Sequence, residues 1–463
     1  MRPDKSPSDP PSPQRDPAPN PPVIVVGGGL AGLTCARTLH RAGVAVRVFE
    51  RADRVGGRVR TDLRDGFLLD RGFQVLNTAY PEARRQLDLE RLDLRSFEPG
   101  ALVRLGRRMH PVSDPFRRPS KVVSTLLAPI GSCLDKLRIA RLRHRVLRQP
   151  VGEILAATEH TTREELESQG FSAQLIERFF EPFYGGVYLE SSLETSSRWF
   201  RLLFRQFARG SAALPAAGME QIPRQLASEL PQDSLRTGLA VRRVWPDRIE
   251  TVDGEVHTAR AVVLACEEPV TQYLLQSGDW PDLASPRGRD PGDLARRSRG
   301  VSCVYLDAPA APAIGASLVL NGQRRRDLQR WPDATINSLC APSLLSAGYA
   351  PPGRNLISVT VLDERRTAEF DPDRLAAAVH EQLGEWFGEM TRGWRTVDVT
   401  RVDYALPTQG LGELRPGRAP RRGAFFVAGD HLETASIQGA LVSGRKTAAT
   451  VLCDLGIDRR AAA

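Results

Sequence analysis

The feature that most constrains the fold is a glycine-rich turn between a buried strand and a helix. The short apolar run at 23–26 has the pattern of a parallel strand buried on both faces. Gly27, Gly29 and Gly32 follow with the spacing G-x-G-x-x-G, and apolar residues at helical spacing continue over 33–39. Glycines at these positions let the backbone approach a pyrophosphate at the positive end of the helix. The segment therefore predicts a dinucleotide-binding unit.

A second predicted strand supports the same unit. It covers 44–49 and ends at Glu50, the spacing at which a carboxylate accepts hydrogen bonds from a ribose diol. A glycine turn alone is a weak signal, and Glu50 alone fits a solvated charge at a strand end. The order of strand, glycine turn, helix, strand and acid favours dinucleotide binding over both of these interpretations.

The chain then continues as RADRVGGRVRT, which places Gly56, Gly57 and Arg58 shortly after Glu50. With these residues the sequence resembles the flavin-containing amine oxidase superfamily, which includes amine oxidases, protoporphyrinogen oxidases and phytoene desaturases. In that family the second glycine pair and its arginine fold over the diphosphate of FAD. Two amides without side chains approach phosphate oxygens closely, and a guanidinium pairs with them. The resemblance therefore implies FAD as the cofactor.

The resemblance covers about 22–455 and has a second FAD segment at 235–266, which has strand-like runs and a turn at Asp253-Gly254. In the family the residue that matches Val241 reaches the adenine side through its backbone. An ordinary strand valine fits the pattern equally well.

A third segment, 425–452, has the pattern of a buried strand, Gly429 and Asp430 at its carboxyl end, and a helix. In the family the matching aspartate bonds the ribityl chain, and the helix N-terminus points at the isoalloxazine, where it stabilises the negative charge of reduced flavin. Capping of the loop is the alternative role for Asp430.

The positions at which the resemblance implies FAD contacts lie in all three segments. They are Gly27, Gly29, Leu30, Ala31, Gly32, Glu50, Arg51, Gly56, Gly57, Arg58, Val241, Gly429, Asp430, Ile437 and Gln438. Mammalian monoamine oxidases bind FAD through a cysteine ahead of the third segment, whereas here the nearest preceding cysteine is Cys340, so FAD is predicted to be non-covalent. No catalytic acid or base is assigned, and His431, which the resemblance brings near the flavin, is interpreted as structural. The scattered cysteines show no metal-ligand spacing.

The predicted fold class is α/β, with a Rossmann-type FAD-binding domain and an inserted substrate domain of mixed sheet plus helices. The expected organisation is a disordered Pro-rich leader at 1–21, FAD-binding segments at 22–79, 213–269 and 421–456, a helical substrate or cap insertion at 80–212, a substrate domain at 270–420 and a tail at 457–463. The cap contains aromatic residues, most of them expected in its core and one or two against substrate: Phe179, Phe180, Phe183, Tyr184, Trp199 and Phe200.

The distribution of lysine discriminates among the enzymes of this superfamily. Many amine oxidases carry a substrate-domain lysine beside the flavin, and this chain has no lysine between Leu137 and Arg445. The C-terminal segment also shows no aromatic pair of the kind that often flanks the flavin in amine oxidases. We therefore expect hydride transfer from a substrate C–H bond to flavin, dehydrogenating a bulky apolar substrate as a desaturase or protoporphyrinogen oxidase does.

Three alternatives stay open. A flavin amine oxidase that acts on a primary or secondary amine is the first, and a non-redox flavin isomerase with every FAD motif retained is the second. The third is a binding protein similar to the Rab GDP-dissociation inhibitors, which share the fold without FAD. Gly56, Gly57 and Arg58 together with Gly429 and Asp430 argue against the third.

The basic balance, with 64 Lys and Arg against 55 Asp and Glu, includes no basic motif interleaved with aromatics, so nucleic acid is not an expected partner. The expected partners are a small-molecule substrate, the bulky apolar one above, and an unidentified electron acceptor. A cytoplasmic location is expected, because no apolar signal segment opens the chain and the cysteines form no disulfide pattern. The stretch 117–148 combines many cations with a short apolar patch, which fits peripheral contact with an anionic membrane surface or a solvated cap helix.

Overall fold

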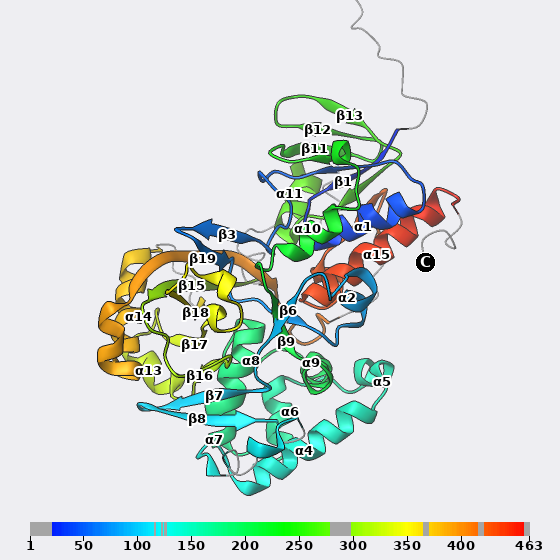
Figure 1. Ribbon diagram of the computed structural model, residues 1–463. Helices are drawn as coiled ribbons and strands as arrows, with labels where there is room; N and C mark the ends of the chain where they lie inside the picture. The colour runs from blue at the N-terminus through cyan, green and yellow to red at the C-terminus, as the bar shows by residue number, and fades with distance from the viewer. Residues whose placement is uncertain are drawn as a thin grey trace, which may run out of the picture.

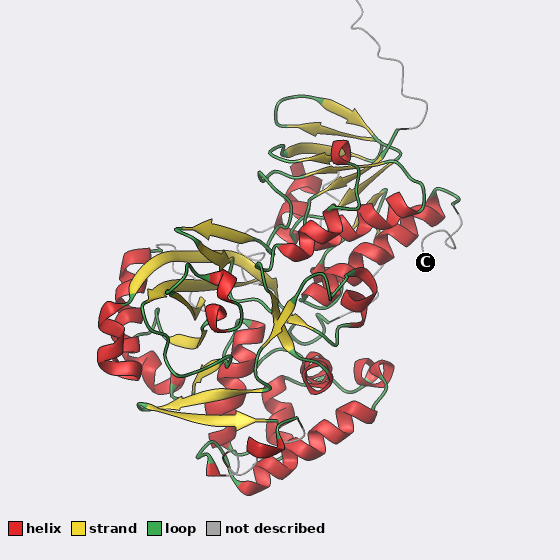
Figure 2. Ribbon diagram, in the orientation of Figure 1, coloured by secondary structure: helices red, strands yellow, loops and turns green. Residues whose placement is uncertain are grey.

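The computed structural model describes residues 21–114, 117–121, 124, 127–277, 298–363, 370–414 and 421–457. Almost all of the expected leader and most of the tail lie outside the described residues. Within the described part, a mostly parallel sheet with its helices, a second and larger sheet, and a group of cap helices lie in three regions (Figures 1 and 2).

The first region is built on a six-stranded sheet with the order β10-β2-β1-β14-β21-β20. Its strands are β1 (Val23–Val26), β2 (Val46–Phe49), β10 (Leu235–Arg236), β14 (Ala261–Leu264), β20 (Arg421–Arg422) and β21 (Phe425–Val427). β1 pairs in parallel with β2 and β14, and β14 pairs in parallel with β21. All residues of β1 and β14 are buried, which explains their continuous apolar sequences. This sheet confirms the predicted Rossmann-type α/β fold.

Helices α1 (Leu30–Arg41) and α15 (Ile437–Asp454) lie side by side against this sheet (Figure 1). Glycines allow the close packing: a Cβ on Gly32 would lie 2.0 Å from the carbonyl oxygen of Gly27, and one on Gly444 would lie 2.3 Å from that of Ala31. The N-terminal and C-terminal segments of the chain are thereby fixed against each other, although hundreds of residues separate them.

Smaller elements surround the parallel sheet. One is the three-stranded antiparallel sheet of β11 (Val241–Trp245), β12 (Arg248–Thr251) and β13 (Val256–Thr258). Two others are the hairpin of β3 (Thr61–Arg64) and β4 (Phe67–Asp70) and the sheet of β5 (Leu76–Asn77), β9 (Ala212–Pro215) and β6 (Leu94–Ser96). The helices are α2 (Pro81–Gln86), α10 (Gln221–Ala227) and α11 (Glu268–Ser277). The predicted turn at Asp253-Gly254 joins β12 to β13, and Val241 opens β11.

The second region is a seven-stranded sheet with the order β19-β15-β18-β17-β16-β7-β8. Its strands are β7 (Gly100–Leu105), β8 (Arg108–Ser113), β15 (Ser298–Ala308), β16 (Val319–Asn321), β17 (Ile336–Cys340), β18 (Asn355–Asp363) and β19 (Arg395–Pro407), with α13 (Arg324–Arg330) and α14 (Pro372–Phe387) beside them. Val379, Leu383 and Trp386 of α14 share a buried cluster with residues of β15 and β18. Because β7 pairs in parallel with β16, the two expected insertions at 80–212 and 270–420 contribute to one sheet.

The third region consists of helices that cover one end of the molecule (Figure 2). They are α4 (Cys133–Arg148), α5 (Val151–Ala156), α6 (Thr162–Ser168), α7 (Ala173–Leu175), a π-helical turn over Ile176–Phe180, α8 (Glu181–Tyr188) and α9 (Ser197–Arg209). Their buried faces form a cluster of their own, in which Phe180, Tyr184 and Phe200 contact one another. No helix of the described residues is both long and apolar enough to cross a membrane.

Candidate active site

A cavity of about 1510 Å³ extends from the parallel sheet, past β19, to the cap helices. Single-ligand pockets usually measure about 300–1,000 Å³, so this one has room for a dinucleotide and a second ligand. Thirteen of the fifteen predicted FAD-contact positions line it: Gly27, Gly29, Leu30, Ala31, Glu50, Arg51, Gly56, Gly57, Arg58, Val241, Gly429, Asp430 and Ile437.

The other two predicted positions do not line this cavity. Gly32 faces the carbonyl of Gly27, where it allows helix α1 to approach strand β1. The side chain of Gln438 turns to α2, where its Oε1 accepts a hydrogen bond of 2.9 Å from the backbone N–H of Glu82. Direct contact of these two residues with FAD stays a prediction.

The two glycine loops lie against each other at the start of α1. The backbone N–H of Gly56 donates to the carbonyl of Gly28 at 2.8 Å, and Gly57 adopts a φ of +57°. A Cβ on Gly57 would lie 3.4 Å from the Cα of Gly29, whereas a Cβ on Gly29 would meet no atom within 4 Å. The first turn of α1 contains no acidic residue, and no side chain caps its N-terminus. These loops therefore leave an open, positively polarised cradle that fits a diphosphate.

Glu50 lies at the end of β2 and is 8% exposed. Its two carboxylate oxygens accept hydrogen bonds from the backbone N–H groups of Gly28, at 2.7 Å, and Ala52, at 2.9 Å. These bonds fix the carboxylate beside the cradle, and because an ionised carboxylate has about four acceptor positions, it can still accept bonds from ribose hydroxyls.

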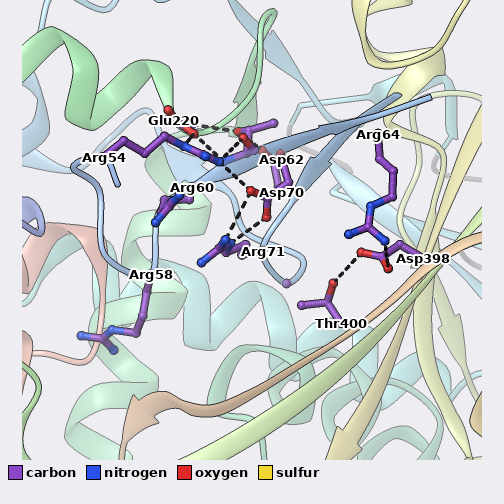
Figure 3. Close-up of polar contacts among 12 residues, drawn as sticks. Arg54, Arg58, Arg60, Asp62, Arg64, Asp70, Arg71, Glu220, Asp398 and Thr400 are labelled. Carbon is purple, nitrogen blue, oxygen red and sulfur yellow. Dashed lines mark hydrogen bonds and ion pairs between the residues drawn. The ribbon is translucent and has the colours of Figure 1, made fainter. Parts of the chain in front are cut away.

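Arg58 and Asp430 connect the first and third FAD segments across the cavity. A nitrogen of the Arg58 guanidinium donates to Oδ1 of Asp430 at 2.7 Å, and another donates to the carbonyl of Ala405 at 2.8 Å. Burial alone would lower the pKa of Arg58, but the neighbouring Asp430 carboxylate more than offsets this and raises it. In Figure 3 the Arg58 side chain points away from the ion-pair network around Asp62. Asp430 is 4% exposed and the Arg58 side chain is 25% exposed, so the pair is a partly buried feature of the cavity wall.

The N-terminus of α15 also reaches the cavity. Ala435, Ser436 and Ile437 line it, and the Ser436 hydroxyl caps the helix by accepting a bond of 3.0 Å from the N–H of Gly439. The first turn of α15 has no acidic residue. Its dipole therefore stabilises negative charge at this place in the cavity. His431 does not belong to the cavity lining, and burial lowers its pKa.

Aromatic side chains form the cap end of the cavity. Phe179, Phe183, Phe204 and Phe207 line it and are all partly exposed, although they belong to the interior of the cap. The rings of Phe179 and Phe183 stack with their centroids 5.5 Å apart, and Phe207 meets Phe183 edge-on at 5.3 Å. We call these four residues the aromatic chamber. Phe180 and Tyr184 also line the cavity, whereas Trp199 and Phe200, which sequence patterning could not distinguish from them, are buried core residues outside its lining.

Another part of the cavity wall carries paired charges. Arg71 donates to Asp62 at 2.7 Å, and Arg64 of β3 reaches Asp398 of β19 at 2.9 Å (Figure 3). All four residues line the cavity. Because each of these two carboxylates already pairs with an arginine, this wall has no surplus of negative charge for a cationic ligand.

The sequence interpretation missed two residues that follow β14. Cys266 and Glu267 line the cavity because the carboxyl ends of parallel strands meet at one edge of the sheet. Burial raises the pKa of the Glu267 carboxyl and raises that of the Cys266 thiol to about 12. Their position at the end of a predicted buried strand was the signal that could have identified them. Among the described residues, no group of His, Cys, Asp and Glu side chains is arranged to hold a metal ion.

Comparison with known proteins agrees with this geometry. The chain is 26% identical to coproporphyrinogen III oxidase of Propionibacterium freudenreichii over 93% of this chain and 90% of that protein. Its fold matches a putative protoporphyrinogen oxidase of Exiguobacterium sp. 255-15 with a TM-score of 0.68 and 18% identity, over 94% of this chain and 99% of that one. It also matches a double mutant of putrescine oxidase with a TM-score of 0.66 and 17% identity, over 93% and 99% of the two chains.

The family model of flavin containing amine oxidoreductases matches residues 30–452, which begin just after Gly29 and include the rest of the first FAD segment and the other two, 235–266 and 425–452. The sequence resemblance is thus confirmed: the chain belongs to the flavin-containing amine oxidoreductase family and is an oxidoreductase with FAD as its cofactor.

Proposed function

We propose that this protein dehydrogenates a bulky, largely apolar substrate that occupies the aromatic chamber. The observation that carries the proposal is the continuity of one cavity between the dinucleotide cradle and four partly exposed phenylalanines. When FAD is bound, its isoalloxazine supplies the chemistry by accepting a hydride from a substrate C–H bond. The relative from Propionibacterium freudenreichii, a coproporphyrinogen III oxidase, supports a porphyrinogen as the substrate.

The chain's own residues have distinct roles in this proposal. The glycine loops and the α1 N-terminus hold the diphosphate, Glu50 accepts bonds from the ribose, and Arg58 with Asp430 fixes the wall beside the ribityl chain. The N-terminus of α15 stabilises negative charge that develops near the flavin ring. The aromatic chamber excludes water and orients the substrate by stacking and apolar contact. No side chain is assigned as a catalytic acid or base.

We also propose that FAD is held non-covalently. Cys133 and Cys266 line the cavity. Cys133 is exposed, on the cap side of the cavity, and the Cys266 thiol donates to the carbonyl of Val26 at 3.2 Å at the nucleotide end. Acid precipitation of the purified protein should release all of its flavin into the supernatant. Flavin retained on the precipitate would contradict non-covalent binding.

Oxidation of an amine is the competing function, because putrescine oxidase shares the fold. The paired charges of Asp62 and Asp398 favour the apolar substrate over a cationic one. The test is anaerobic mixing of the holoprotein with porphyrinogens, polyenes, and primary and secondary amines while flavin absorbance is followed. We expect bleaching by an apolar candidate. Rapid bleaching by an amine alone would establish amine oxidation instead, and turnover of a substrate without net flavin reduction would indicate an isomerase.

The finer expectations about location are proposals too. We infer a cytoplasmic location, since all six cysteines are free, and contact with a membrane at one face of the cap.

A further inference from the structure

The exposed side of helix α4 and the turn before it carry unusually accessible leucines. Leu134 is 62% exposed, Leu137 is 67% exposed and Leu127 is 79% exposed. Leu137 also lines the large cavity, together with Cys133 and Ala140 of the same helix. A side chain that is mostly exposed and still lines a cavity lies at the place where the cavity meets the surface. Leu137 therefore lies at a mouth of the cavity at the cap, with Leu134 exposed on the same helix.

The same helix is strongly basic. It contains six Lys and Arg residues and a single acidic residue, Asp135. Asp135 is fully buried and accepts hydrogen bonds from the N–H groups and hydroxyls of Ser132 and Ser172. Among the described residues of this helix, its one ion pair is with Arg138, at 3.5 Å, and not with the exposed arginines that follow. The helix therefore presents a net positive surface beside the cavity mouth.

Apolar and cationic residues share one exposed stripe of α4. Leu134 and Leu137 begin it, and Arg141, Arg145 and Arg148 continue it at helical spacing, all of them exposed. We call these five residues and Leu127 the cap face. Exposed apolar side chains flanked by cations are the pattern of a helix that lies in the interface of an anionic bilayer.

We propose that the cap face docks on an anionic lipid bilayer and opens the cavity mouth toward the lipid. The leucines insert among the acyl chains, and the arginines contact anionic headgroups. A second copy of this chain is a poorer partner, because a two-fold contact would bring the arginine stripes of both copies together. The proposal extends the proposed function, since a membrane is a reservoir of bulky apolar substrates. Docking itself requires no turnover and is measured separately.

The first measurement is cosedimentation of the full-length holoprotein with vesicles of phosphatidylcholine, with or without about one-third phosphatidylserine. We expect binding to the anionic vesicles that weakens as salt is raised, and much weaker binding to pure phosphatidylcholine. Each basic residue near such a surface changes affinity by about fivefold, so Arg141→Glu with Arg145→Glu should weaken binding by about 25-fold or more. Leu134→Ser with Leu137→Ser should weaken it by about tenfold or more.

Matched control variants separate docking from general electrostatics and from misfolding. Arg242→Glu with Arg392→Glu changes the net charge equally at exposed positions on β11 and near the end of α14. Leu63→Ser removes another exposed leucine, on β3. These controls should bind vesicles like the unmodified protein, and every variant should keep its FAD and its melting temperature.

Three results would overturn the proposal. The first is that the unmodified protein does not bind anionic vesicles. The second is that the control and cap-face variants lose vesicle binding equally. The third is that the leucine variant changes from dimer to monomer while no protein binds vesicles. The last result would assign the face to self-association. Failure of every apolar substrate to reduce the flavin would refute the proposed reaction and leave the vesicle result unaffected.

Discussion

Arg58 and Asp430 lie 372 residues apart in the sequence and form a direct ion pair in the cavity wall. The sequence predicts that both residues contact FAD, but it does not predict that they contact each other. Because Asp430 is nearly buried, its removal leaves the Arg58 guanidinium with the Ala405 carbonyl as its remaining hydrogen-bond partner and the Tyr404 ring beside it. We therefore expect Asp430 to act on the cofactor site both directly and through Arg58.

Asp430→Ala should weaken FAD binding by about tenfold or more, because one charged hydrogen bond contributes about 1.5–3 kcal/mol. Titration of the apoprotein with FAD measures the affinity. Asp247→Ala removes a carboxylate that is 70% exposed and pairs with the adjacent Arg248, and it should leave the affinity unchanged. Equal affinities in Asp430→Ala and the unmodified protein would exclude Asp430 from the site.

Gly57 tests the cradle at a single position. Gly57→Val places a branched side chain at a φ of +57° and directs it toward Gly29, so we expect a protein purified without flavin. Gly106→Val is the matched control, since Gly106 has a φ of +62° and open space around its Cα. The control carries the same backbone strain and should retain the visible absorbance of FAD. A full complement of FAD in Gly57→Val would show that this loop does not contact the diphosphate.

At the scale of elements, α1 and α15 join the two ends of the chain at the cofactor site. Gly444→Ala should lower the free energy of unfolding by about 1–3 kcal/mol, because the added methyl group would lie 2.3 Å from the Ala31 carbonyl. Gly152→Ala, in the exposed part of α5, has no atom within 4 Å and should slightly stabilise the protein through helix propensity. Thermal unfolding of both variants measures the difference. Equal stability of Gly444→Ala and Gly152→Ala would mean that α1 and α15 can move apart without lowering the free energy of unfolding.

The elements differ in how well the sequence predicts them. β1, α1, β14, β21 and α15 were predictable, because short apolar runs, glycine turns and helical spacing are local signals. The parallel pairing of β7 with β16 was not, because it joins two segments expected to belong to separate insertions. The same limit applies to the site. Motif spacing marks Gly56 and Asp430, whereas Glu267 belongs to no motif and only its place after a predicted buried strand points to the cavity. Side-chain direction was also unpredictable, as Gln438 shows by turning to α2.

At the scale of the whole molecule, Asp70 joins the nucleotide-binding part to the larger sheet. It is buried, and its carboxylate accepts hydrogen bonds from the Tyr349 hydroxyl at 2.8 Å and the Met219 N–H at 2.9 Å. Burial raises the pKa of Asp70 to about 6, although its hydrogen bonds oppose the rise. An unfolded chain releases this proton near pH 3.8. Between these values the folded state holds the proton, so the stabilising contribution is complete below about pH 4 and is lost as the pH rises through about 6.

Asp70→Asn cannot ionise and should lack this pH dependence. The free energy of unfolding of the variant minus that of the unmodified protein should increase by about 1–3 kcal/mol from about pH 4 to pH 7, because only the unmodified protein loses stability over this range. Denaturant unfolding of both proteins at several pH values gives the difference. A difference that is constant over this range would show that Asp70 does not titrate as its burial requires.

The central claim is that substrate in the aromatic chamber reacts with FAD in the adjoining cradle. Its most direct test is the rate of anaerobic flavin reduction by a porphyrinogen or polyene in Phe207→Ala and in Phe387→Ala. Both phenylalanines are partly buried, but only Phe207 lines the cavity. We expect Phe207→Ala to keep its FAD and to slow flavin reduction at limiting substrate by about tenfold or more, because the lost apolar contact is worth about 1.5–3 kcal/mol. In Phe387→Ala the flavin should be reduced at the unmodified rate. Equal rates in the two variants would contradict the central claim.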